Sequence, residues 1–201
     1  MNKIPFLVLA VTAFCFLTCK EPVYNPKPRT YPKVNYPERA YQAFKKSECA
    51  FTFEYPTYAQ ITQNEGITQA KNTPDCIFDL FIPAFDSRLH CTYYQINSQN
   101  EFAELWNDAF DLANKHNVRA EYIEENKIQN AKGVGGFAFD IKGPAASPFQ
   151  FFLTDSTQHF LRASLYFNTQ VRQDSMAPVY DFVIEDLMKI VESFEWKEAG
   201  K

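Results

Sequence analysis

The chain has 201 residues, with 20 Lys and Arg against 24 Asp and Glu, so its formal net charge is −4. This mild acidity argues against nucleic-acid binding, which needs a basic face to neutralise phosphates. Hydrophobic residues make up 46% of the chain and include 20 Phe, which argues against global disorder. The length suits a single domain, and no apolar run reaches the roughly 20 residues of a membrane-spanning helix.

Residues 1–18 are predicted to be a secretory signal peptide. Lys3 precedes an uncharged stretch from Ile4 to Leu17, which is the order of a basic region and a short hydrophobic region. Cys19 ends this stretch and is followed at once by the polar Lys20. This placement is typical of a bacterial lipoprotein, whose Cys becomes linked to diacylglycerol. We therefore predict lipidation at Cys19; the alternative is an ordinary signal peptide or an uncleaved anchor.

Residues 19–45 are predicted to be the lipidated Cys followed by a proline-rich tether. Five prolines lie between Lys20 and Ala40, and such a composition gives a semi-rigid, extended spacer. Four tyrosines in this segment leave a second possibility open, that it docks on the domain or on a partner. They are Tyr24, Tyr31, Tyr36 and Tyr41. A solvated linker is the simpler interpretation.

Residues 46–201 are predicted to form one globular domain, most of it strands. Alternation of apolar and polar residues predicts strands at 51–55, 77–82, 89–96, 119–124, 137–141, 149–153 and 160–167, with a short strand at 59–62. Pro83–Arg88 and Thr154–Gln158 read as hairpin loops. Tight hairpins imply a largely antiparallel sheet.

Two long helices are predicted to interrupt the strands. Ser98 and Glu101 have the spacing of a capping box, and apolar residues then recur every three or four positions until a helix end near Lys115 or His116. The second helix is predicted to begin near Asp174, with Pro178 in its first turn. Its apolar face runs to Phe194, and Phe194–Trp196 closes the domain.

The fold class is therefore α+β, a largely antiparallel sheet covered by two long helices. The order of the elements, with the closing Ser193–Trp196, resembles the PsbP/Mog1-type α-β-α sandwich. A resemblance at the level of the fold implies no function by itself.

The candidate catalytic residues do not form a recognised motif. His90, His116 and His159 are scattered, and none belongs to an H-x-x-x-H pair. Ser147 with Asp140 and a histidine is an imaginable triad, but no G-x-S-x-G elbow accompanies it. Gly133–Gly136 reads as a turn into a strand rather than a phosphate-binding loop. We predict that the protein is not an enzyme and has neither catalytic residues nor a cofactor.

The cysteines after Cys19 lie in an exported, oxidising environment. Cys49 and Cys76 each precede a predicted strand, and a disulfide between them would close a loop of 26 intervening residues and stabilise the fold by about 3 kcal/mol. Cys91 sits inside a strand and reads as a small buried thiol. The alternative is a zinc site made by these three cysteines and His90. Because no C-x-x-C pair supports it, we predict no metal.

Several segments together resemble the gliding-motility lipoprotein GldD family of the Bacteroidetes, and the resemblance runs over nearly the whole chain after Cys19. They are Pro26–Arg29, Cys49–Tyr58, Asp140–Ser147, Phe151–Arg162, Leu165–Asn168 and Asp174–Val179. The resemblance implies an envelope lipoprotein that is needed for gliding and for the type IX secretion machinery that delivers surface adhesins. It implies a membrane anchor through lipid on Cys19, exposure to the periplasm, other gliding and secretion envelope proteins as partners, and a possible Cys49–Cys76 bridge. It offers no catalytic residues.

The predicted function is thus a non-enzymatic assembly or scaffold component of the gliding and secretion apparatus. The alternative is a periplasmic binder of a small apolar ligand or glycan fragment, because the strands are rich in aromatic residues. A third hypothesis, an envelope hydrolase, would need Ser147, Asp140 or a histidine to meet in a cleft.

Overall fold

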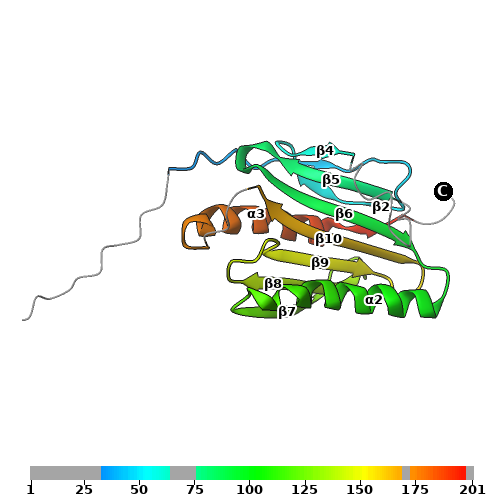
Figure 1. Ribbon diagram of the computed structural model, residues 1–201. Helices are drawn as coiled ribbons and strands as arrows, with labels where there is room; N and C mark the ends of the chain where they lie inside the picture. Colours follow the sequence, from blue (N-terminus) through cyan, green and yellow to red (C-terminus); the bar gives the residue numbers. More distant parts are fainter. Residues whose placement is uncertain (1–32, 64–75, 169–172, 198–201) are drawn as a thin grey trace, which may run out of the picture. The chain divides into compact units, whose positions relative to one another are not determined.

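The computed structural model describes residues 33–63, 76–168 and 173–197 (Figure 1). Its main element is a seven-stranded antiparallel sheet in the order β4-β5-β6-β10-β9-β8-β7. The strands of this sheet are β4 (Gln60–Thr62), β5 (Cys76–Ile82), β6 (Ser87–Gln95), β7 (Tyr122–Gln129), β8 (Gly135–Lys142), β9 (Phe149–Thr154) and β10 (His159–Phe167). The α+β prediction with a large antiparallel sheet is confirmed.

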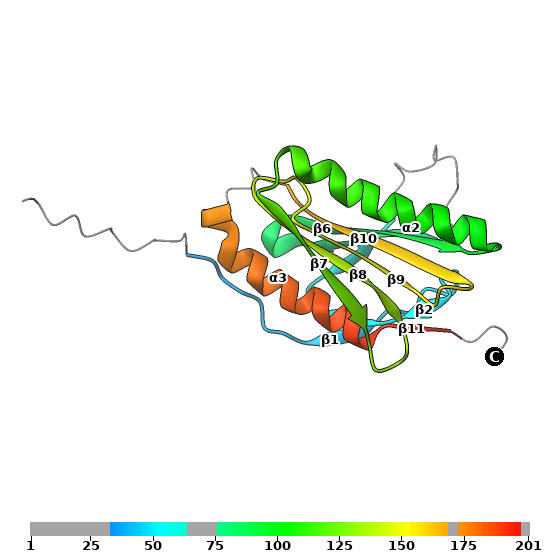
Figure 2. The same ribbon diagram turned by 90° about the horizontal axis from the view of Figure 1, so that it is seen from below.

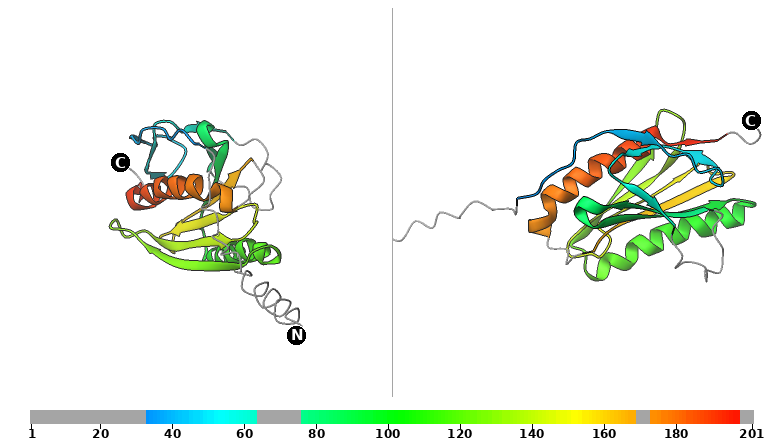
Figure 3. Two further views of the ribbon diagram at one scale, coloured as in Figure 1. Left: turned by 90° about the vertical axis from the view of Figure 1, so that its left-hand side faces the viewer. Right: turned by 90° about the horizontal axis from the view of Figure 1, so that it is seen from above.

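Two α-helices lie on opposite faces of this sheet, as Figures 2 and 3 show. Helix α2 (Gln99–Asn114) covers one face, and α3 (Gln173–Ser193) covers the other. The prediction of two long helices is wrong in part. Helix α3 has 21 residues, whereas α2 has 16, because the 3-10 turn η3 (Lys115–Val118) takes over at its end.

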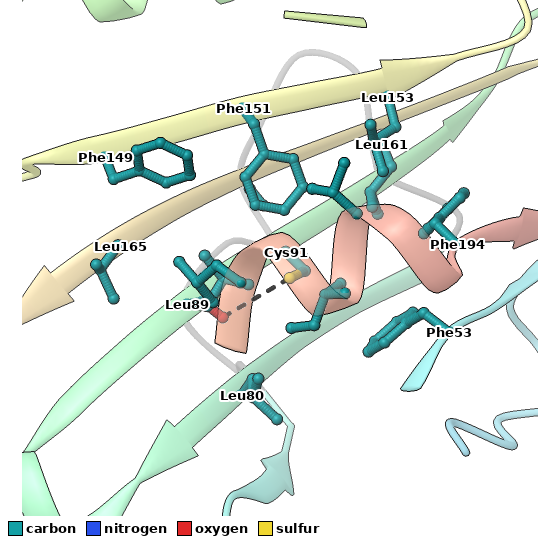
Figure 4. Close-up of a cluster of buried hydrophobic side chains, with 14 of the residues drawn as sticks. Phe53, Leu80, Leu89, Cys91, Phe149, Phe151, Leu153, Leu161, Leu165 and Phe194 are labelled. Atoms are coloured by element: carbon teal, nitrogen blue, oxygen red, sulfur yellow. Dashed lines mark hydrogen bonds between the residues drawn. The ribbon is translucent and has the colours of Figure 1, made fainter. Parts of the chain in front are cut away.

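Strict alternation along the strands produces two separate cores. On β6 and β10, Leu89, Cys91 and Leu165 point toward α3 and join a cluster that includes Phe151 and Phe194 (Figure 4). The opposite residues of β8, β9 and β10 point toward α2; among them are Phe139, Phe152 and Phe160. The face toward α3 is thus apolar across the central strands, whereas the apolar cluster under α2 is confined to part of the other face.

A third group of short strands packs beside α3 and against strand β5 of the main sheet. Strand β1 (Tyr41–Ala43) pairs with β3 (Glu54–Pro56), and β11 (Glu195–Trp196) pairs with β2 (Phe51–Thr52). Phe44, Phe51 and Phe53 from this group form a stack of rings with centroids 4.6 to 6.1 Å apart. The stack continues to Phe78 of β5 and to Phe194 at the end of α3. Aromatic packing therefore joins both ends of the described chain to the sheet.

The described end of the predicted tether, residues 33–45, packs on the domain. Phe44 is 2% exposed within the core. The described part of this segment carries large apolar side chains that the domain buries, as the alternative of a docked segment expects. The signal peptide, Cys19 and the first part of the tether lie outside the described residues.

Two helix starts differ in detail from the prediction. Ser98 Oγ accepts from the Glu101 amide at 3.2 Å, as the capping box requires, but Glu101 accepts from the Asn97 amide rather than from Ser98. Helix α3 begins at Gln173, so Pro178 lies in its second turn and not in its first. The five residues before Pro178 are helical although Pro178 has no amide to donate to the Asp174 carbonyl.

The strand predicted at 119–124 is in fact β7, Tyr122–Gln129. Arg119 and Ala120 donate their amides to the His116 carbonyl and so finish the turn after α2. The strand then runs on through mostly exposed residues; only Ile123 and Ile128 pack against the two cores. The strand predicted at 51–55 is divided into β2 and β3.

Candidate functional site

The predicted hydrolase residues have structural partners instead of a common cleft. Ser147 is fully buried, and its hydroxyl lies 3.5 Å from the Phe149 carbonyl oxygen. Asp140 lies 2.6 Å from Lys142 Nζ and accepts from Tyr180 OH at 2.8 Å. Burial raises the pKa of Tyr180, and the Asp140 carboxylate raises it further. The contact between Asp140 and Tyr180 ties β8 to α3.

The three histidines lie in three different places. His159 Nδ1 lies 2.8 Å from Tyr93 OH, and its ring stacks on Trp196 at 4.9 Å. His116 lies in the 3-10 turn after α2, where burial lowers its pKa and the charge of Arg162 lowers it further. The structure therefore does not bring the histidines together.

The third histidine, His90, belongs to a polar row that sequence reasoning missed. Asp79, His90, Ser164 and Gln150 face each other directly across β5, β6, β10 and β9. His90 Nδ1 lies 2.6 Å from Asp79 Oδ1. This order of Asp, His and Ser has the residue types of a catalytic triad, and the alternation of the three strands was the signal that could have revealed it.

The geometry of this row does not prepare Ser164 as a nucleophile. Ser164 is 5% exposed, and its hydroxyl has no hydrogen-bond partner among the described residues. A triad requires the base to hold the nucleophile's proton at hydrogen-bond distance. Gln150 is equally buried and accepts from Arg162 at 2.9 Å. The row therefore reads as a polar layer of the sheet.

Of the three cysteines in the described ranges, two form a disulfide and one is a free thiol. Cys49 and Cys76 are joined by a disulfide with their Cα atoms 5.6 Å apart, which leaves neither of them as a thiolate for the alternative zinc site. Cys91 is a free, buried thiol beside Leu89 (Figure 4), and burial raises its pKa. In the described ranges, no three His, Cys, Asp or Glu side chains gather closely enough to hold a metal ion. Cys19 lies outside those ranges.

The strongest candidate for a functional feature is the docked N-terminal segment, residues 34–44, which we call the strap. Tyr36 packs on Phe182 of α3 with ring centroids 4.8 Å apart. The Arg39 guanidinium lies 4.1 Å from the centre of the same ring, and its Nη2 donates to the Phe182 carbonyl at 3.1 Å. Strand β1 then continues the strap by pairing with β3.

A buried carboxylate holds the strap in place. Asp186 on α3 is fully buried and accepts hydrogen bonds from Tyr41 OH, at 2.9 Å, and from Tyr58 OH. Arg39 Nε lies 3.4 Å from the same carboxylate, and Arg39 also pairs with the exposed Glu185. Burial raises the pKa of Tyr41 to about 12, and the hydrogen bond to Asp186 contributes to the rise. The strap is thus bound by charge-assisted hydrogen bonds, which are the strong ones.

Asp186 was detectable in the sequence. It lies four residues after Phe182 and three after Val183, on the apolar face of the predicted helix. A charge is almost never fully buried unless it is paired. The tyrosines of the predicted tether were the other half of this signal.

A groove separates α3 from the edge of the sheet. Its volume is about 350 Å³. Its apolar residues come from β7, β8, β9 and α3 and are Ile128, Ala138, Phe149, Met188 and Val191; its polar ones are Asn126, Lys127, Gln129, Asn130, Asp140 and Glu192. Ligand pockets usually measure about 300–1,000 Å³, so this groove is at the small end of that range.

No described helix is long and apolar enough to cross a membrane. Comparison with protein families gives a match of residues 21–196 to a family described as gliding motility lipoprotein GldD. Among curated proteins, none matches the chain. Among solved structures, the solution structure of cyanobacterial PsbP (CyanoP) from Synechocystis sp. PCC 6803 is similar at 11% identity with a TM-score of 0.46. The similarity covers 82% of this chain and 97% of that one.

Proposed function

The chain belongs to the gliding motility lipoprotein GldD family, and we propose on that premise that its domain is a non-enzymatic scaffold of the gliding apparatus. Membership makes the protein a membrane-anchored lipoprotein of the cell envelope. The proposal adds lipidation at Cys19, exposure of the domain to the periplasm, and service to the associated type IX secretion machinery. Its partners would be other gliding and secretion envelope proteins.

The docked strap is the observation that carries the scaffold role. A lipid on Cys19 would hold the domain through the strap, and the strap enters the domain on α3 through Tyr36, Arg39 and Tyr41. The chain from Cys19 to Lys33 can extend over at most roughly 50 Å. The domain would therefore stay within that distance of the membrane and be held by one defined face, as a scaffold needs.

The non-enzymatic part of the proposal is supported by the two serines that could act as nucleophiles. Ser147 and Ser164 are both buried. The hydroxyl of Ser147 contacts a backbone carbonyl, and that of Ser164 has no partner among the described residues. A nucleophilic serine needs a base at hydrogen-bond distance and access to substrate.

The test is replacement of the gene in gliding cells by variants of the full chain. Cells without the protein should neither glide nor secrete adhesins, and Cys19→Ala should fail to restore both. Ser147→Ala and Ser164→Ala should restore both fully. Normal gliding and secretion in cells that lack the protein would end the scaffold proposal. Loss of function in Ser164→Ala cells that contain normal amounts of folded protein would end its non-enzymatic part.

The groove beside α3 favours one second function, the binding of a small apolar ligand or glycan fragment. Its apolar floor, with Phe149 and Met188, and its polar rim have the composition of a small-ligand site. Protein from native envelopes should then carry a small molecule detectable by native mass spectrometry, and Met188→Trp should exclude it. Ligand-free wild-type protein would count against this function.

A further inference from the structure

The two edges of the main sheet are very different. Strand β4 at one edge has three residues, whereas β7 at the other edge has eight. Among the described residues β7 pairs only with β8, and six of its eight side chains are exposed. A long unpaired edge is a template for another strand, and natural proteins usually shorten or cover it. Strand β7 is long, and no described strand pairs with its outer side.

The hairpin at the end of β7 fixes which backbone groups face outward. Asn130 donates its amide to the Val134 carbonyl at 3.0 Å, and Gly133 donates to Asn130. On the other side of β8, the Ile141 amide donates to the Pro148 carbonyl at 2.8 Å, so the odd-numbered residues of β8 bond toward β9 and its even-numbered residues bond toward β7. The register pairs even-numbered residues of β8 with even-numbered residues of β7, and bonded pairs recur at every second residue of an antiparallel ladder. The even-numbered residues of β7 bond to β8. The outward amides and carbonyls belong to Ile123, Glu125, Lys127 and Gln129.

The side chains of this edge are complementary to themselves. Glu125 and Lys127 lie two residues apart on the same face, both are exposed, and neither forms an ion pair with a described residue. If β7 meets β7 of a second copy in antiparallel orientation, with Asn126 opposite Asn126, then Glu125 lies opposite Lys127 of the second copy. Symmetry repeats this pair, so two opposite-charge pairs form. Opposite charges across a ladder stabilise it, and like charges destabilise it.

We infer that β7 is a self-association edge, at which two copies of the chain pair antiparallel about a two-fold axis at Asn126. The pairing joins the two seven-stranded sheets into one. The same patch serves on both copies, as a closed two-fold dimer requires. A single strand pair buries less than a standard interface. Tethering to a common membrane raises the effective concentration, so the dimer is expected on the membrane.

Cysteine trapping in native envelopes tests the axis directly. In this register the two Asn126 Cα atoms lie about 4.5 Å apart, within the range of about 4.4–6.8 Å that a disulfide spans. Asn126→Cys in the full chain should give a disulfide-linked dimer under mild oxidation. The matched control is Glu124→Cys, which is equally exposed but is separated from its copy by four strand positions, about 13 Å. Because Cys49 and Cys76 are bonded and Cys91 is buried, the described cysteines add little background.

Charge exchange then tests the register. In the Asn126→Cys background, Glu125→Lys or Lys127→Glu places like charges opposite each other twice, and the yield of dimer should fall about tenfold. The double variant Glu125→Lys/Lys127→Glu restores both opposite-charge pairs and should restore the yield. The inference is overturned by any of three results: no dimer from Asn126→Cys, equal trapping at residue 124, or no rescue by the double variant. A trapped product with the mass of another protein also overturns it. None of these results bears on gliding, so the proposed scaffold function is tested separately.

Discussion

The attachment of the strap to α3 depends on one buried charge, and replacing it has a predictable effect. Asp186→Ala removes the acceptor of two tyrosine hydroxyls and the nearest buried countercharge of Arg39. Leaving buried donors unpaired costs about 1–3 kcal/mol, and removing one member of a buried ionic group costs about 3–5 kcal/mol. Because Arg39 retains some access to water, with 32% of its side chain exposed, we expect a loss of about 3 kcal/mol in the free energy of unfolding.

The neighbouring Glu185 is a matched control. It carries the same charge and pairs with the same Arg39, but its side chain is 65% exposed. An exposed ion pair contributes less than about 1 kcal/mol, so Glu185→Ala should have little effect. Urea unfolding measures both variants on the same scale.

Limited trypsin digestion shows whether the strap itself is released. The bond after Arg39 is protected while the strap is docked, and local opening exposes it. Asp186→Ala should speed cleavage after Arg39 far more than Glu185→Ala does. Equal unfolding free energies for the two variants, within about 0.5 kcal/mol, would refute the assignment of Asp186 as the anchor of the strap. Unchanged cleavage after Arg39 in Asp186→Ala would refute it as well.

Three other predictions concern pH, the disulfide and a close backbone contact. Since the pKa of Tyr41 is raised from 10.0 to about 12, the strap contact is fully formed below pH 10.0 and should weaken as the pH rises to about 12. Urea unfolding over this interval should show a stability loss that is smaller in Tyr41→Phe, and equal pH profiles for the two proteins would contradict the contact. Replacing both Cys49 and Cys76 by Ser should lower the free energy of unfolding by about 3 kcal/mol. Thermal unfolding with and without reductant measures this loss: reductant should destabilise the wild-type chain and leave the double variant unchanged. Gly136→Ala should destabilise the fold by about 3 kcal/mol or more, because a Cβ there would meet the Phe152 carbonyl. At Gly135 the atom nearest to an added Cβ is 3.7 Å away, so Gly135→Ala should be nearly neutral. Equal losses of unfolding free energy at both sites would contradict the packing.

The centre of the fold was readable from the sequence because its strands alternate strictly. In β10 the alternating residues point to two different helices: Leu161 and Leu165 join the cluster under α3, and Phe160 joins the cluster under α2. The N-cap of α2 was equally readable, since Ser98 and Glu101 act within four residues of each other. Local sequence patterns therefore predicted those elements that depend on residues close to one another in the chain.

The features that the sequence did not predict depend on contacts between residues far apart in the chain. Six of the eight residues of strand β7 are exposed, so alternation of apolar and polar residues does not mark its length. Tyr41 and Asp186 are 145 residues apart, and no local pattern indicates that a proline-rich segment should end in a strand against α3. The polar row with His90 and Ser164 likewise depends on a register that only the paired strands define.

The most direct measurement of the scaffold role is a crosslinking pull-down from native envelopes through a C-terminal tag, with Cys19→Ala as the control. We expect gliding and secretion proteins to be recovered with the wild-type chain and to be lost with Cys19→Ala. Recovery of the lipidated wild-type chain without any other envelope protein would contradict it.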